Sequence, residues 1–159
     1  MEKLWAPWRE KFIAGKKEKG CVFCRCLKEK KDRENFILFR GKNAFVILNL
    51  YPYNSGHLMI VAQRHQAQLE NLTPPEAQEM IQLSQVWVKI LKKALRPDGI
   101  NLGININQAS GAGIHEHVHI HIVPRWQGDT NFMPILANTK VISVSLKSIY
   151  KRLKAQLKK

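Results

Sequence analysis

Several short stretches of the chain alternate between apolar and polar residues, and turn-forming residues separate them. Alternation with a period of two is typical of a β-strand, because successive side chains on a strand point to opposite faces of the sheet. The stretches NFILFR and AFVILNL surround the turn residues 41–43, so they predict an antiparallel hairpin. The predicted strands are residues 35–40, 44–50, 57–62 and 100–107, followed by a run of alternating histidines that begins after residue 113.

One long stretch has a helical period instead. Its apolar residues recur at spacings of three and four between Met80 and Ala94, and Pro97 ends the pattern. The sequence TPPE at 73–76 has the form of a capping box with prolines in the first turn. We therefore predict one long helix between the third and fourth strands, and a shorter, strongly basic amphipathic helix from about Ser145.

This order of elements predicts an α+β fold. The connections between the strands are too short for parallel crossovers, so we expect about five antiparallel strands with one long helix and helical ends. No internal repeat and no linker rich in Pro, Gly or Ser divides the chain, and 159 residues are enough to bury one sizeable core. We expect a single domain over residues 1–159, with a distinct N-terminal segment at 1–34 and the basic helix at 143–159.

The formal net charge is +14, and much of the excess of Lys and Arg lies near the two ends of the chain. Three interpretations remain open: a solvated Lys-rich surface, a groove for nucleic acid, or a field that attracts small polyanions such as nucleotides. No apolar run approaches the roughly 20 residues of a membrane helix, and the first residues, MEKLWAPWREKF, lack the features of a secretory signal. We expect a cytoplasmic protein that does not bind a membrane.

The stretch GIHEHVHIHIVPRW, residues 113–126, places four of the six histidines at alternate positions. On a strand, the apolar residues between the histidines face the core, and the histidines form a ladder on the other face. The ladder comprises His115, His117, His119 and His121. Its central member, His119, is suited to attack phosphorus, because a neutral imidazole is a good nucleophile and leaves well once protonated.

Neighbouring groups fit this chemistry. His117 and His121 are placed to donate hydrogen bonds to phosphate oxygens or to fix the tautomer of His119. The Gly-rich stretch QASGAG at 108–113 precedes the ladder, where backbone N–H groups can hold an anion. Two other interpretations remain open on spacing alone: alternate histidines that share a metal ion, and a polar strand face without chemistry.

Three cysteines, Cys21, Cys24 and Cys26, lie within six residues. In a chain without a secretory signal, an odd number of crowded cysteines favours metal binding over disulfides. The first two have the two-residue spacing that is common in zinc half-sites. The cysteines therefore predict a metal site.

The histidine run resembles the signature of the histidine-triad (HIT) family, in which three histidines alternate with apolar residues; here it reads HVHIHIV at 117–123. Residues 45–65 are similar to the family's earlier hairpin, with Asn49 and His57 at its spacing of eight residues. NLGININQASGAG resembles the strand and Gly-rich turn before the triad. The stretch 124–142 and the N-terminal WAPWR resemble a bacterial branch of diadenosine-polyphosphate phosphorylases or hydrolases. The resemblance covers nearly the whole chain and implies the HIT-like fold.

The resemblance implies an enzyme that cleaves or transfers nucleotide phosphoanhydrides, with dinucleoside polyphosphates such as diadenosine tetraphosphate as substrates. In such a mechanism His119 attacks the α-phosphate to form a nucleotidyl-histidine, which water or inorganic phosphate resolves. His57 and His121 stabilise the phosphate oxygens, and the carbonyl of His117 orients the nucleophile. The implied nucleotide-binding residues are Asn49, Asn107, Gly111 and Gly113.

The chain departs from the family at the junction before the triad. Other branches carry a Gln, Ser or Thr there that assists the leaving group, whereas a stretch one residue shorter, GIHE at 113–116, stands here. His115 is the residue of this stretch that substitutes as a proton donor. The uridylyltransferase branch fits less well, because it has Gln at the position of His121.

The same resemblance interprets the cysteines. In related proteins a cysteine pair binds zinc together with a histidine after the third strand and the first histidine of the triad. The resemblance implies one structural zinc ion per chain, held by Cys21, Cys24, His65 and His117, which makes 1–34 a zinc-binding segment. Cys26 as a third thiolate ligand, and thiols without a metal, remain open alternatives.

The relatives also imply a homodimer that acts on a nucleotide substrate. A rival of another class is a zinc-containing module that binds nucleotides or nucleic acid without catalysis and uses the charge of +14. That rival leaves the histidine ladder without a purpose. Because the basic ends of the chain carry no interleaved base-stacking aromatics, we expect no specific nucleic-acid binding.

Overall fold

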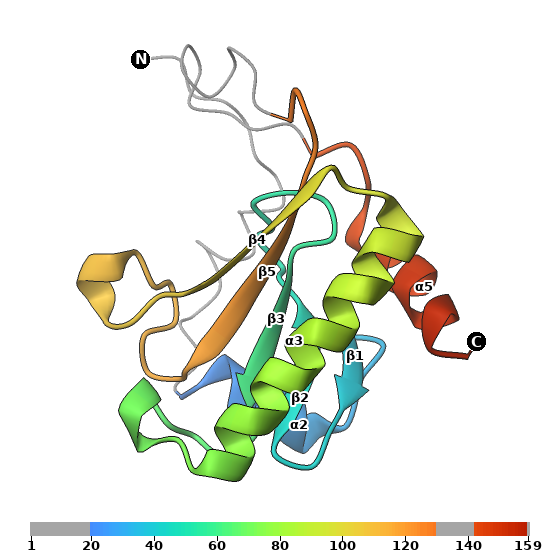
Figure 1. Ribbon diagram of the computed structural model, residues 1–159. Helices are drawn as coiled ribbons and strands as arrows, with labels where there is room; N and C mark the ends of the chain where they lie inside the picture. Colours follow the sequence, from blue (N-terminus) through green and yellow to red (C-terminus); the bar gives the residue numbers. More distant parts are fainter. Residues whose placement is uncertain (1–19, 130–141, 159) are drawn as a thin grey trace, which may run out of the picture.

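The computed structural model describes residues 20–129 and 142–158, and Figure 1 shows their arrangement. Three parts of the sequence used above lie outside the described residues: WAPWR at 5–9, the first nineteen residues of the N-terminal segment, and residues 130–141 of the stretch that resembles the bacterial branch.

The described residues form one five-stranded antiparallel sheet, as the sequence predicts. The strand order is β1-β2-β3-β5-β4, so the histidine-bearing strand β5 lies between β3 and β4. The strands are β1 (Ile37–Arg40), β2 (Ala44–Leu48), β3 (Leu58–Ala62), β4 (Gly99–Ile104) and β5 (His119–Arg125). The first three lie inside their predicted ranges, and β4 begins one residue earlier than predicted.

The helices are α2 (Val22–Glu29), α3 (Pro74–Leu95) and α5 (Leu146–Lys154), with short 3-10 turns η1 (Leu69–Asn71), η2 (Gln108–Ser110) and η3 (Ala155–Lys158). The predicted long helix is α3. Its start follows the capping box, since the Glu76 carboxylate accepts the backbone N–H of Thr73 at 2.8 Å. Among the described residues, no helix is both long and apolar enough to cross a membrane.

The two faces of the sheet are covered by different helices (Figure 1). On one face, α3 and α5 form the larger core, which takes in the apolar residues of the histidine run as predicted. The core on the α2 face comprises Phe23, Cys26, Ile37, Phe45, Ile47, Met59 and Val61. His119 and His121 pair directly with Val61 and Met59 of β3, so their side chains lie on the α2 face. The histidines therefore face α2.

Arg40 holds the C-terminal end of α2 against the sheet. Its guanidinium donates to the carbonyls of Leu27 at 3.0 Å and Cys26 at 3.3 Å, and it forms an ion pair with Asp32 at 2.7 Å. These carbonyls belong to the last turn of the helix, where they have no partner within the helix. With the buried side chains of α2, Arg40 fixes where the cysteine pair lies.

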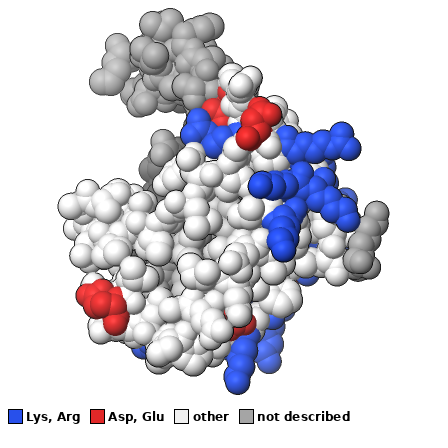
Figure 2. Space-filling model, viewed as in Figure 1, with Lys and Arg blue, Asp and Glu red and all other residues white. Residues whose placement is uncertain are grey.

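One group of basic side chains lies over the helices that cover the sheet face opposite the histidines (Figure 2). Figure 2 shows Lys and Arg over α5 and the end of α3, on a face that is otherwise largely uncharged. We call this group the α3–α5 basic cluster; it includes Lys92, Lys93, Lys151, Arg152 and Lys154. Because α5 packs in the core on the α3 face, the cluster is separated from the histidines by the sheet.

Candidate active site and metal centre

The predicted histidine ladder is only partly formed. His119 and His121 are the first and third residues of β5, whereas His117 lies ahead of the strand and His115 is exposed before it. His117 still keeps the predicted face, since it packs against Phe23 of α2 as His119 does. The prediction of one four-residue ladder is therefore wrong at His115. The reason is that β3 ends at Ala62, so the chain before His119 has no strand on that side to continue the pairing.

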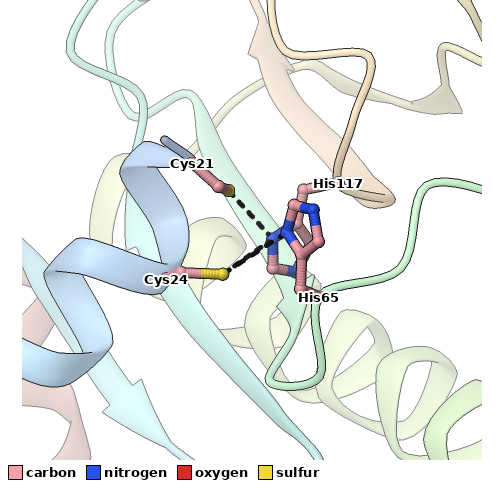
Figure 3. A group of neighbouring side chains, drawn as sticks. All are labelled: Cys21, Cys24, His65 and His117. Carbon is pink, nitrogen blue, oxygen red and sulfur yellow. Dashed lines mark hydrogen bonds between the residues drawn. The ribbon is translucent and has the colours of Figure 1, made fainter. Parts of the chain in front are cut away.

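His117 instead joins a group of four side chains that point toward one another (Figure 3). Its Nδ1 atom lies 3.2 Å from Sγ of Cys21 and 3.8 Å from Sγ of Cys24. Nδ1 of His65 lies 3.4 Å from Sγ of Cys24. All four ligand atoms lie within 4.8 Å of one another. The structure thus brings together the four residues that the family resemblance implies as metal ligands.

The geometry of this Cys/His cluster fits a tetrahedral zinc ion. Zn–S bonds of about 2.3 Å and Zn–N bonds of about 2.0–2.1 Å imply sulfur–nitrogen separations of roughly 3.5 Å, close to those found. Nε2 of His117 donates to the carbonyl of Ala62 at 2.8 Å, which leaves the lone pair of Nδ1 facing the cysteines. The donor set and its orientation both suit a structural zinc site.

The electrostatics of the cluster agree with this fit. Burial, and then the neighbouring Cys21, raise the pKa of Cys24 to about 11, so the thiolate is disfavoured when no cation is present. A dication at the centre reverses this by stabilising the thiolates. Burial lowers the pKa of His117, which keeps its ring neutral and able to act as a ligand.

Cys26 takes no part in the cluster. Its side chain is buried in the apolar core beneath α2, and burial raises the pKa of its thiol. Cys26 follows Cys24 by two residues, which at 3.6 residues per turn places it on the opposite side of the helix. The structure therefore does not support Cys26 as a third thiolate ligand.

His119 is buried, and its ring orientation is fixed by the backbone. Nδ1 donates to the carbonyl of His117 at 2.7 Å. Because a carbonyl oxygen only accepts, the proton lies on Nδ1 and the neutral ring keeps its lone pair on Nε2. Burial lowers the pKa of His119 and so favours this neutral form. Phe23 packs edge-on against the rings of His119 and His117, with centroid distances of 5.2 and 5.4 Å.

A chain of hydrogen bonds gives His121 the opposite tautomer, with its proton on Nε2 and not on Nδ1. The backbone N–H of Tyr53 donates to Nδ1 of His57 at 3.0 Å, so the proton of the neutral His57 ring lies on Nε2. That N–H donates to Nδ1 of His121 at 2.9 Å, which leaves the N–H of His121 on its Nε2. Burial, and then the neighbouring histidines, lower the pKa of His57 to about 3 and that of His121 to about 4, so both rings are neutral at pH 7.

The site therefore combines a lone pair and a hydrogen-bond donor on adjacent rings. The ring centroids of His119 and His121 are 4.7 Å apart. The lone pair on Nε2 of His119 can attack an electrophilic phosphorus. The N–H on Nε2 of His121 can stabilise the negative charge that develops on a phosphate oxygen. This arrangement is able to perform the chemistry that the family resemblance implies for His119, His121 and His57, with His117 contributing its carbonyl.

The predicted nucleotide-binding residues divide into two groups. Asn49 follows β2 beside His57, with its Nδ2 atom 3.4 Å from Nδ1 of His57. Asn107, Gly111 and Gly113 lie exposed in the connection between β4 and β5, and no hydrogen bond joins them to the histidines. The N–H of Gly111, which has φ 84°, is already bonded to the carbonyl of Gln108 at 3.0 Å. The structure therefore places Asn49, and not these three residues, against the histidines.

Two contributors to the site are not predicted by the sequence analysis. The backbone N–H of Tyr53 sets the tautomer of His57, and the signal for it is the turn sequence YPYNSG, which carries the chain back to the histidine. Phe23 packs on both His117 and His119, and its signal is an aromatic residue between two ligand cysteines. Neither signal identifies a contact without the fold.

The sequence of residues 30–128 matches the model of the HIT domain, and the chain belongs to the histidine-triad family. It is similar to a Mycobacterium tuberculosis (strain CDC 1551 / Oshkosh) protein called AP-4-A phosphorylase, with 35% identity over 150 residues that cover 89% of this chain and 77% of the relative. It is also similar to a Saccharomyces cerevisiae (strain YJM789) protein called bis(5′-adenosyl)-triphosphatase, with 30% identity over 92 residues that cover 57% of this chain and 44% of the relative.

A solved structure shares the fold. It is a Zn-bound histidine triad family protein from Mycobacterium smegmatis, with a TM-score of 0.71 and 24% identity, covering 87% of this chain and 94% of that one. The family and the α+β fold that the sequence predicts are thus confirmed.

Proposed function

We propose that this protein cleaves the phosphoanhydride bonds of dinucleoside polyphosphates by transferring a nucleotidyl group to His119. A bond forms between Nε2 of His119 and the α-phosphorus. The bond from that phosphorus to the bridging oxygen breaks, and the leaving nucleoside polyphosphate takes the electron pair. Water or inorganic phosphate then attacks the same phosphorus, loses its proton to solvent, and releases the histidine. With diadenosine tetraphosphate, the adenylyl group stays on His119 and ATP leaves.

The observation that supports the proposal most strongly is the pair of tautomers in the site. His119 donates from Nδ1 to a backbone carbonyl, and His121 accepts on Nδ1 from His57, so the Nε2 atoms carry a lone pair and an N–H respectively. A phosphoryl group bound between them meets a nucleophile and an oxyanion donor at once. The names of the relatives, AP-4-A phosphorylase and bis(5′-adenosyl)-triphosphatase, support dinucleoside polyphosphates as the substrate class.

The acceptor is tested by the products of diadenosine tetraphosphate. ATP and AMP mean that water attacked the nucleotidyl-histidine, and ATP and ADP mean that inorganic phosphate did. The name of the Mycobacterium tuberculosis relative favours phosphorolysis. We expect millimolar phosphate to raise the rate and to shift the product from AMP to ADP. An unchanged rate with AMP as product leaves the hydrolase, and no cleavage of the tetraphosphate removes the proposed function.

We propose that the Cys/His cluster holds one structural zinc ion per chain and that residues 1–34 form the zinc-binding segment. The sulfur–nitrogen separations of 3.2, 3.4 and 3.8 Å and the free lone pair of His117 support zinc. The Zn-bound relative of the same fold supports it as well. The ion ties α2, and Phe23 with it, to the residue whose carbonyl orients His119. Metal analysis of protein purified without a His tag is expected to give close to one equivalent of zinc.

We propose that Asn49, Asn107, Gly111 and Gly113 contact the nucleotide, and that the protein is a homodimer. In support of the dimer, β4 lies at an edge of the sheet, is uncharged, and carries Leu102 with 52% of its surface exposed. An edge strand without charged side chains leaves backbone N–H and C=O groups free to pair with another strand. The β4 strand of a second copy of the chain can provide these partners. Sedimentation is expected to show a dimer, and Leu102→Lys is expected to shift it toward the monomer.

A further inference from the structure

We infer that a cavity beside His121 binds the second nucleoside of the substrate, the one that departs with the leaving group. The inference rests on the proposed function and adds a binding site to it. The cavity has a volume of about 310 Å³, at the lower end of the range for small-molecule sites. Its lining includes Tyr53, Asn101, Gly103, Asn105, His121 and Arg125.

The position of the cavity suits the distal half of a dinucleotide. Gly103 of β4 pairs directly with His121, so both lie on the sheet face that carries the nucleophile. At about 3.4 Å per residue, the cavity extends along β5 from about 7 Å beyond His119, at His121, to about 20 Å beyond it, at Arg125. Asn49 follows β2, on the other side of β3 from the cavity. A dinucleotide whose first nucleoside lies at Asn49 and whose phosphates cross the histidines therefore places its second nucleoside at the cavity.

The charges in the cavity favour a nucleoside over a phosphate group. Arg125 is the cation of the lining, but its guanidinium forms a bidentate pair with Asp129 at 2.6 and 2.8 Å. Its remaining nitrogen, Nη1, donates to Oδ1 of Asn101 at 2.9 Å. His121 is neutral at pH 7 because its pKa is lowered to about 4. With its cation paired to a carboxylate, the cavity suits an uncharged ligand.

The lining also offers the groups that recognise a nucleobase. The Tyr53 side chain is 52% exposed and rests against the rings of His57 and His121, with centroid distances of 4.7 and 5.8 Å. A ring held in this way is a platform on which a base can stack. Arg125 fixes the amide of Asn101 with its oxygen occupied, so its NH₂ group can donate to a base or ribose. Asn105 adds a second amide.

Two substrates that differ only in the second nucleoside test the inference. Diadenosine tetraphosphate and adenosine 5′-tetraphosphate carry the same phosphate chain and give the same adenylyl-His119, but the leaving groups are ATP and triphosphate. We expect kcat/KM for diadenosine tetraphosphate to be about fivefold or more higher in the wild-type protein, because a stacked base contributes at least that much to binding.

Two variants remove the subsite without touching the nucleophile. Gly103→Val fills the cavity, and the structure tolerates it because a Cβ at Gly103 meets no atom within 4 Å and the residue lacks a positive φ. Tyr53→Ala removes the platform but keeps the backbone N–H that holds His57. Gly103→Val is expected to lower kcat/KM for diadenosine tetraphosphate about fivefold or more and to change that for adenosine tetraphosphate less than about threefold. Because the Tyr53 ring also rests against His57 and His121, Tyr53→Ala is expected to lower kcat/KM for both substrates, and about fivefold or more further for diadenosine tetraphosphate. Tyr51→Ala, two residues away on the same loop and outside the lining, is the matched control.

The outcomes separate the subsite from the proposed function. Equal kcat/KM for the two substrates in the wild-type protein overturns the subsite, and so does an equal loss on both substrates in the two variants. If the wild-type protein cleaves neither substrate, the proposed function fails and the subsite fails with it. Loss of diadenosine tetraphosphate preference in both variants, with Tyr51→Ala unchanged, supports the assignment.

Discussion

The Cys/His cluster and the histidine site both depend on histidine side chains, but they use different ring nitrogens. The two sites meet at His117, whose ring lies in the cluster and whose carbonyl contacts His119. In both, a ring nitrogen that donates to a backbone carbonyl leaves a lone pair on the other nitrogen: Nδ1 of His117 faces the cysteines, and Nε2 of His119 faces the site. His121 differs because its Nδ1 accepts from another histidine, which leaves an N–H on Nε2. The contact behind each ring therefore decides which nitrogen is left free and whether it offers a lone pair or an N–H.

Replacing the proposed nucleophile, His119, is expected to disable the histidine site and to leave the Cys/His cluster intact. His119→Ala is expected to lower the rate of diadenosine tetraphosphate cleavage by about 10³-fold or more, because the covalent route is lost. It is expected to keep its zinc and its ability to bind nucleotide, since His119 is not one of the four ligands. The wild-type protein, quenched in base because phosphoramidates are acid-labile, is expected to carry an adenylyl mass on His119. Full activity in the variant contradicts the proposed mechanism.

Replacing a proposed metal ligand is expected to disrupt the Cys/His cluster instead. Cys24→Ser is expected to lose the zinc and to lower the free energy of unfolding by about 3 kcal/mol or more, because a structural zinc contributes its binding energy to folding. Metal analysis and urea unfolding measure the two effects. Cys26→Ala is the matched control: it changes a buried thiol outside the cluster and is expected to keep its metal. A full metal load in Cys24→Ser contradicts the ligand assignment.

Acid sharpens the comparison by testing whether His57 and His121 are neutral. Their pKa values, about 3 and 4 in the folded protein, lie below the value of about 6.5 in the unfolded chain. Their contribution to stability is therefore fully present above about pH 6.5 and is lost as the pH falls toward 4 and then 3. His57→Gln is expected to flatten the dependence of unfolding free energy on pH between 6 and 5 by about 1.4 kcal/mol per pH unit. Superimposable curves for variant and wild type contradict the neutral pair.

Salt is expected to have the smallest effect, because the histidine site is built from neutral rings. The apparent affinity for diadenosine tetraphosphate is expected to weaken by only about threefold between 50 and 300 mM salt, since the α3–α5 basic cluster lies across the sheet and its field is screened over about 10 Å. Lys151→Gln combined with Arg152→Gln is expected to reduce this salt dependence without changing the rate at saturation. Sequence-selective retention of an oligonucleotide at physiological salt contradicts the expectation of no specific nucleic-acid binding.

The sequence predicts the regular elements well because their patterns are local. Strand alternation places the ends of β1 to β3 within two residues and those of β4 within three, and the capping box marks the start of α3. The sequence predicts a helical N-terminal end but not the residues at which α2 begins and ends. The eight residues of α2 form a helix mainly because Phe23 and Cys26 pack on the sheet. That packing depends on residues far away in the chain, so no local pattern announces it.

The candidate site divides in the same way. The predicted set of four metal ligands comes together in space, because spacing and family resemblance specify it. The ladder is wrong at His115 because strand periodicity cannot tell where the neighbouring strand ends. The tautomers of His57, His119 and His121 depend on a backbone N–H and on carbonyl positions, which carry no side-chain signal. Residue identity predicts the candidates, and tertiary hydrogen bonds decide their roles.

The Cys/His cluster also has a consequence for the order in which the chain folds. Its contacts join residues 41 and 96 positions apart, whereas β1 and β2 meet across the short turn at 41–43. Closing long loops costs more chain entropy and is slower than forming local contacts. We therefore expect the hairpin and α3 to form first and α2 to dock last, when a metal ion draws the ligands together. A chelator added during refolding would then leave a chain with an intact sheet whose α2 amides exchange freely with solvent.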